Sequence, residues 1–146
     1  MSLSPRLLRV VDALPLAPGA RVLEIGGAPG AAAREVADRV GPSGHVLVLD
    51  RSARGIARTR SACAPLVEAG VLSTLCADVE SFVLPAGTTP FDLAFACRVG
   101  ALDGRHPGMR AAALEHVAAA LTASGRLFVD TGRPLREITL PPTGNR

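Results

Sequence analysis

The architecture of this chain follows from one stretch, 21-RVLEIGGAPG-30. Its first half, Arg21 to Ile25, is a short and mainly apolar run, typical of a strand buried in a parallel sheet. Gly26 to Gly30 is a turn of small residues, and a helix is expected from Ala31, with Pro29 in its first turn. A strand, a glycine turn and a helix start bring backbone N–H groups close to a ligand. The stretch therefore predicts a ligand site at the end of the first strand.

Glu24 restricts the chemistry of that ligand. It lies two positions before Gly26, near the carboxyl end of the strand, where a carboxylate without a partner is costly. A phosphate would repel the carboxylate, because like charges repel. We therefore expect a cationic or hydrogen-bond-donating ligand, or a set of backbone N–H groups, beside Glu24.

The pattern Glu-x-Gly-x-Ala-x-Gly, from Glu24 to Gly30, resembles the first motif of the class I S-adenosylmethionine-dependent methyltransferases. Members of that family usually carry glycine at the position of Ala28. The resemblance implies an α/β fold, a Rossmann-like doubly wound, mostly parallel sheet of five or six strands with helices on both faces. It also implies S-adenosylmethionine as the cofactor, S-adenosylhomocysteine as its product, and methyl transfer by in-line displacement.

Two further acidic residues are expected at the same edge of the sheet. Asp50 follows a predicted strand at 45–49 and lies about twenty residues after the glycine turn, where an acidic side chain can bind ribose hydroxyls. Asp78 follows a predicted strand at 71–76 and is placed against the adenine amino group, with Val79 packed on the adenine. The alternative for both acids is a purely local role as a turn or cap residue.

The resemblance also assigns the acceptor side of the site. The loop after a fourth predicted strand, 91–97, faces the methyl group in the family, so Arg98, Asp103, Arg105 and His106 are candidate acceptor-side groups. Of these, Arg98, Asp103 and His106 are the candidates for a catalytic group. A base is needed if the acceptor is a hydroxyl or a carbon acid. No catalytic residue is assigned beyond these candidates. The full set of expected cofactor-binding residues is Glu24, Gly26, Gly27, Ala28, Gly30, Asp50, Arg51, Asp78, Val79 and Arg98.

The composition is that of one domain of 146 residues, 48% of them hydrophobic. We divide it into an N-terminal cap helix (1–19), a core (20–131) and a short C-terminal tail (132–146). Four Phe residues and no Tyr or Trp disfavour base stacking, and a net charge of +3 is mild, so a nucleic-acid partner is not expected. The default acceptor is a small molecule. Arg51, Arg54 and Arg58 form a basic helix face, which is either solvated or an anion contact.

Three other features set expectations. The cysteines Cys63, Cys76 and Cys97 are far apart, so no metal site is expected, and the last two are predicted to be buried thiols. No apolar run has membrane-spanning length and no signal peptide is recognisable, which favours a cytoplasmic location without a membrane partner. After a fifth strand at 126–130, one more strand at 136–140 is the most that fits, where the family has two. A homodimer that covers the resulting sheet edge is our hypothesis.

Two other function classes stay open. An NAD(P)-binding oxidoreductase domain is compatible with Gly26, Ala28 and Asp50, and Arg51 could meet a 2′-phosphate. Against it, the third glycine of its motif would be an alanine, and the Glu24 carboxylate would approach the pyrophosphate. The other class is a non-catalytic or degenerate cofactor-binding module that acts as a partner subunit, which the short C-terminus favours.

Overall fold

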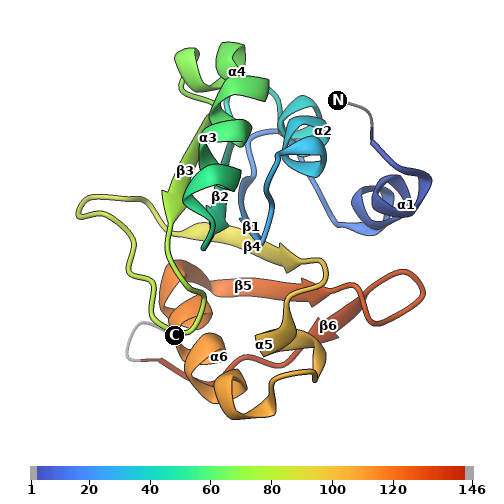
Figure 1. Ribbon diagram of the computed structural model, residues 1–146, viewed down its shortest axis with the longest axis vertical. Helices are drawn as coiled ribbons and strands as arrows, with labels where there is room; N and C mark the ends of the chain where they lie inside the picture. The colour runs from blue at the N-terminus through green and yellow to red at the C-terminus, as the bar shows by residue number, and fades with distance from the viewer. Residues whose placement is uncertain (1–2, 144–146) are drawn as a thin grey trace.

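The computed structural model describes residues 3–143, in which a six-stranded sheet lies between two layers of helices (Figure 1). The strand order is β3-β2-β1-β4-β5-β6, and all pairs are parallel except β5 with β6. This arrangement confirms the predicted fold class. The strands are β1 (Arg21–Ile25), β2 (His45–Asp50), β3 (Leu72–Cys76), β4 (Phe91–Ala96), β5 (Leu121–Val129) and β6 (Arg136–Ile138).

The two faces of the sheet are buried by different helices. Leu23 and Ile25 of β1 belong to the apolar cluster that includes Val117 of α6, whereas Val22 belongs to the cluster with Val10 of α1 and Val36 of α2. This follows from the two-residue period of a strand, which sends successive side chains to opposite faces. One layer contains α1 (Pro5–Ala13), α2 (Ala31–Val40), α3 (Ala53–Ala62) and α4 (Ala64–Glu68); the other contains α5 (Gly100–Asp103), the 3₁₀ turn η1 (Pro107–Met109) and α6 (Arg110–Ala120).

Several boundaries differ from the predicted ones. The single helix expected after Ser52 is divided at Cys63 into α3 and α4, because Pro65 has no N–H with which to continue the helical hydrogen bonds. Pro29 is not in the first turn of α2, since Gly30 adopts a left-handed conformation before the helix begins. Strand β5 starts earlier than predicted, at Leu121, which pairs with Phe91. The expected last strand is present as β6 but is shorter.

The cysteines also depart from expectation. Cys63 is buried, and Cys97 is half-buried, but Cys76 is exposed, so the prediction of a buried thiol at Cys76 was wrong. Cys76 is the last residue of β3, which forms the edge of the sheet, and fewer elements cover a side chain there. Within residues 3–143, no helix has the length and apolar character to span a membrane.

Candidate functional site

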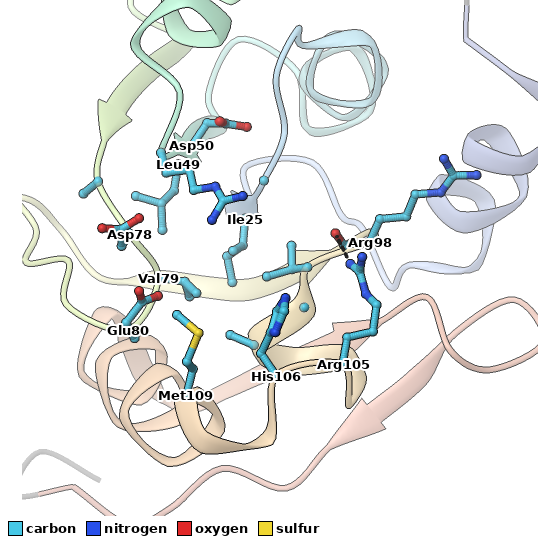
Figure 2. A pocket seen from close by; sticks show the side chains of 16 residues that line it. Ile25, Leu49, Asp50, Asp78, Val79, Glu80, Arg98, Arg105, His106 and Met109 are labelled. Carbon is cyan, nitrogen blue, oxygen red and sulfur yellow. Dashed lines mark hydrogen bonds between the residues drawn. The ribbon is translucent and has the colours of Figure 1, made fainter.

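A cavity of about 450 Å³ opens at the carboxyl edge of the sheet, and we call it the edge cavity (Figure 2). Its walls come from the segments that follow β1, β2, β3 and β4. Strands β1 and β4 are neighbours, but β1 leads to α2 on one face and β4 leads to α5 on the other. Ligands of open α/β sheets bind at such a switch point. The lining residues are Ile25, Gly26, Leu49, Asp50, Arg51, Ala77, Asp78, Val79, Glu80, Arg98, Val99, Gly100, Ala101, Arg105, His106 and Met109.

The glycine turn presents bare main chain to the edge cavity at one residue only. Gly26 lines it with φ +70°, and its N–H donates to the Leu49 carbonyl at 2.7 Å. A Cβ at Gly26 would lie 2.8 Å from the Val99 Cγ2 atom, so a side chain there would have to displace Val99. Gly27, Ala28 and Gly30, also expected in the site, shape the turn but do not line the cavity. Gly27 is needed because a Cβ would lie 2.6 Å from the Cδ atom of Glu24.

Glu24 lies beneath this turn and not on the cavity wall. Its neighbour Ile25 lines the cavity, and the alternation of side chains sends Glu24 to the opposite face, toward α1 and α2. The side chain is 4% exposed, and its Oε1 atom has no hydrogen-bond partner among residues 3–143. Burial, and to a smaller degree the charge of Asp50, raises the pKa of Glu24 to about 8. Of the three acids expected together, Asp50 and Asp78 line the edge cavity and Glu24 does not.

The first of these two acids is Asp50, which ends β2 and ties the turn to the next helix. Its carboxylate accepts hydrogen bonds from the N–H of Ala28 at 3.1 Å and of Ser52 at 2.9 Å. Ser52 in turn caps α3 by accepting from the N–H of Gly55. Asp50 thus has the local role considered as an alternative. The same carboxylate lines the edge cavity and keeps further acceptor positions for a ligand.

Asp78 is the second acid, and it follows the adjacent strand β3. Its carboxylate accepts no hydrogen bond from residues 3–143, and it lines the cavity together with Val79 and Glu80 (Figure 2). Val79 is 8% exposed and packs into the core cluster beside Leu49. The arrangement is three carboxylates, of Asp50, Asp78 and Glu80, above an apolar wall, which suits a ligand that combines hydrogen-bond donors with a flat apolar body.

On the other side of the cavity, the structure separates the three candidates for a catalytic group. Arg98 has φ +56° and lines the cavity, but its guanidinium points away, toward α1 (Figure 2). Asp103 does not line the cavity. It forms an ion pair with Arg105 at 2.9 Å, and this contact lowers the pKa of Asp103. Arg105 also donates to the Arg98 carbonyl at 2.7 Å.

His106 is the candidate whose side chain faces the cavity (Figure 2). Its imidazole lies over Gly100, where a Cβ would overlap the ring. Eight lining residues were not among the expected site residues, and they are Ile25, Leu49, Ala77, Glu80, Val99, Gly100, Ala101 and Met109. Glu80 follows Asp78 by two positions, which is a usable signal, whereas Met109 comes from η1, whose position depends on tertiary packing. Among residues 3–143, no three His, Cys, Asp or Glu side chains are grouped to hold a metal ion.

Comparisons with known proteins agree with this geometry. Residues 22–125 match the family model described as "Methyltransferase domain". TrmN from Thermus thermophilus is similar in structure, with a TM-score of 0.64 and 27% identity over 84% of this chain and 35% of that one. A SAM dependent methyltransferase from Aquifex aeolicus has a TM-score of 0.69 and 17% identity over 84% of this chain and 62% of that one.

A third similar structure is a SAM-dependent methyltransferase from Thiobacillus denitrificans in complex with S-adenosyl-L-homocysteine. It has a TM-score of 0.65 and 21% identity over 87% of this chain and 48% of that one. The present chain thus spans between 35% and 62% of the length of these three proteins. No curated protein sequence matches it significantly.

Proposed function

Since the family match covers residues 22–125, the chain belongs to the class I S-adenosylmethionine-dependent methyltransferases, and we propose that it transfers a methyl group from S-adenosylmethionine to a small acceptor in the cytoplasm. One observation carries the proposal beyond family membership. Asp50 ends β2 and Asp78 follows the adjacent strand β3, and both line one cavity whose apolar wall contains Leu49 and Val79. A nucleoside offers the matching chemistry, namely hydroxyl and amino donors on a flat ring.

The residues present fit this cofactor. Asp50 would accept hydrogen bonds from the ribose hydroxyls, and Asp78 would accept one from the adenine amino group. Val79 would pack on the ring, and the bare main chain of Gly26 would allow close approach. Arg51 lies at the rim beside Asp50. Glu24 is buried below the turn and does not line the cavity. The direct contact with the cofactor that is expected from its sequence motif stays a prediction.

The chain's contribution to the reaction is mainly alignment and exclusion of water. When bound, the cofactor supplies a methyl group that its sulfonium charge already activates. The protein must then hold the acceptor in line with that methyl group. His106 faces the cavity and is our candidate to accept a proton at its imidazole if the acceptor is a hydroxyl. Gly100, which leaves room for the ring, positions it.

Calorimetric titration with S-adenosylhomocysteine and with NADH tests the cofactor. We expect the first to bind and the second not to bind. Asp78→Asn should weaken binding of S-adenosylhomocysteine about tenfold, because the acceptor of the adenine amino group loses its charge and a charge-assisted hydrogen bond is the stronger kind. Asp38→Asn is the matched control, since Asp38 is exposed on α2 and outside the cavity. Equal affinity of Asp78→Asn and the control, or tighter binding of NADH, would contradict the proposal.

Turnover of a labelled methyl donor over a panel of small acceptors then separates an enzyme from a non-catalytic partner subunit. Product formation supports the methyltransferase, whereas tight cofactor binding without turnover of any acceptor favours the partner subunit. The homodimer is a further proposal, based on the short edge strand β6. Light scattering that finds a monomer at tens of micromolar would contradict it.

A further inference from the structure

A second cavity, of about 470 Å³, lies between α1 and the turn that follows β5. Three arginines line it: Arg6 and Arg9 from α1, and Arg133 from the turn. We call it the arginine cavity. Gly132, also in its wall, has no room for a Cβ because the Leu135 carbonyl lies against it, so the turn that presents Arg133 is tightly folded.

The arginine cavity carries more positive charge than its own acid can offset. Asp130 is the acid in its wall, and it forms an ion pair with Arg6 at 3.1 Å. Neither Arg9 nor Arg133 forms an ion pair or a side-chain hydrogen bond with residues 3–143. Guanidinium groups match the oxygens of carboxylates and phosphates, and both arginines are exposed and free to bind them.

Arg98, which lines the edge cavity, is hydrogen-bonded to Asp130, which lines the arginine cavity. The Asp130 carboxylate accepts from the Arg98 N–H at 3.2 Å. The Arg98 guanidinium extends from there toward α1, which adds a cation on the side of the arginines (Figure 2). A molecule held by the arginines would therefore lie on the acceptor side of the edge cavity, beyond Arg98.

We propose that the arginine cavity binds the carboxylate or phosphate group of the methyl acceptor, so that the acceptor is a small anionic molecule. Arg9 and Arg133 bind the oxyanion, and Asp130 holds Arg6 in the wall beside them. The identity of this ligand as the acceptor rests on the proposed function, whereas the binding of an oxyanion does not.

Titration of the full chain with inorganic phosphate, followed by the backbone amide signals in NMR spectra, tests the site. We expect saturable shifts confined to α1 and residues 130–134. Arg9→Gln and Arg133→Gln should each weaken phosphate binding about threefold to tenfold, as expected for loss of one charged contact. Arg58→Gln is the matched control, because Arg58 is exposed on α3 and lines neither cavity.

Equal weakening in the control, or shifts spread along α3, would overturn the site. Circular dichroism checks that each variant is folded. The Arg9→Gln and Arg133→Gln variants should keep the wild-type affinity for S-adenosylhomocysteine, and phosphate should still bind when that compound is saturating. A parallel loss of affinity for S-adenosylhomocysteine would assign the cavity to the cofactor and overturn the acceptor assignment.

The turnover assay separates an acceptor group from a free anion. Acceptors that turn over should be anionic, with a KM raised about threefold to tenfold by Arg9→Gln and an unchanged kcat. Turnover of neutral acceptors alone, or an unchanged KM, would overturn the acceptor assignment. If S-adenosylhomocysteine does not bind at all, the proposed function fails, and the phosphate titration still decides whether the arginine cavity binds an oxyanion.

Discussion

Glu24→Gln should make the protein more stable at neutral pH, although Glu24 belongs to the motif around which the chain is built. The carboxyl group is buried, and its Oε1 atom has no partner among residues 3–143. Burial in a low-dielectric environment disfavours the charged form. The side chain of glutamine has nearly the same shape as that of glutamate and cannot ionise. The substitution therefore removes the pH-dependent ionisation of residue 24 and changes the packing little.

The magnitude follows from the pKa. Folding raises the pKa of Glu24 from 4.5 to about 8. Below the lower value the group is protonated in both states. Above pH 4.5, Glu24 loses its proton in the unfolded chain but keeps it in the folded protein. The free energy of unfolding therefore falls as the pH rises from 4.5 to the folded pKa of about 8. The loss is ~1.4 kcal/mol per pH unit, or about 3 kcal/mol between pH 4.5 and pH 7.

Urea unfolding of the wild type and of Glu24→Gln at several pH values between 5 and 8 provides the measurement. The free energy of unfolding of Glu24→Gln minus that of the wild type should rise by ~1.4 kcal/mol per pH unit in this window. Glu68→Gln is the control, because Glu68 is exposed at the end of α4, and its difference should stay flat. A flat or falling difference for Glu24→Gln would refute the assignment of a buried, protonated carboxyl.

Three further predictions concern packing and reactivity. Gly27→Ala should lower the free energy of unfolding by about 1–3 kcal/mol in urea titrations, because the new Cβ would lie 2.6 Å from the buried carboxyl side chain below it. Phe95→Ala, at a residue with no exposed surface in β4, should cost about 3–5 kcal/mol in the same assay, whereas Val83→Ala, at a 75% exposed position, should cost under about 0.5 kcal/mol. A thiol reagent at pH 8, followed by mass spectrometry, should modify exposed Cys76 well before Cys97. Burial raises the pKa of the Cys97 thiol to about 12, so little of the reactive thiolate forms there. Faster labelling of Cys97 than of Cys76 would contradict this prediction.

Most of the fold could be predicted because its signals are local. The apolar run of β1, its glycine turn and the strand ends at Asp50 and Asp78 each lie within a few consecutive residues. Parallel strands bring their carboxyl ends to one edge of the sheet, so the sequence alone predicted that Asp50 and Asp78 lie together, and both line the edge cavity. The broken helix at Cys63 also had a local signal, in Pro65, but the prediction did not use it.

The site was predicted less well where a side chain's direction depends on distant contacts. The alternation along β1 shows that Glu24 and Ile25 face opposite sides, but which side contains the cavity depends on how α2 and α5 pack. Arg98 was expected to point into the site. Its N–H instead donates to Asp130, 32 residues away in the sequence, its φ is positive, and its guanidinium points away from the cavity (Figure 2).

By itself, the sequence indicated the family, through the resemblance of its Glu24–Gly30 motif. It also determined the order of the strands along the chain and the two acids at the carboxyl edge, because short-range periodicity and turn chemistry control those features. Only the tertiary structure decided that Glu24 is buried below the glycine turn, that His106 faces the cavity over Gly100, and that arginines from α1 and from the turn after β5 share a second cavity. The physical reason is that these arrangements depend on packing between segments as far apart as Arg6 and Asp130, and nothing in either segment alone records the other.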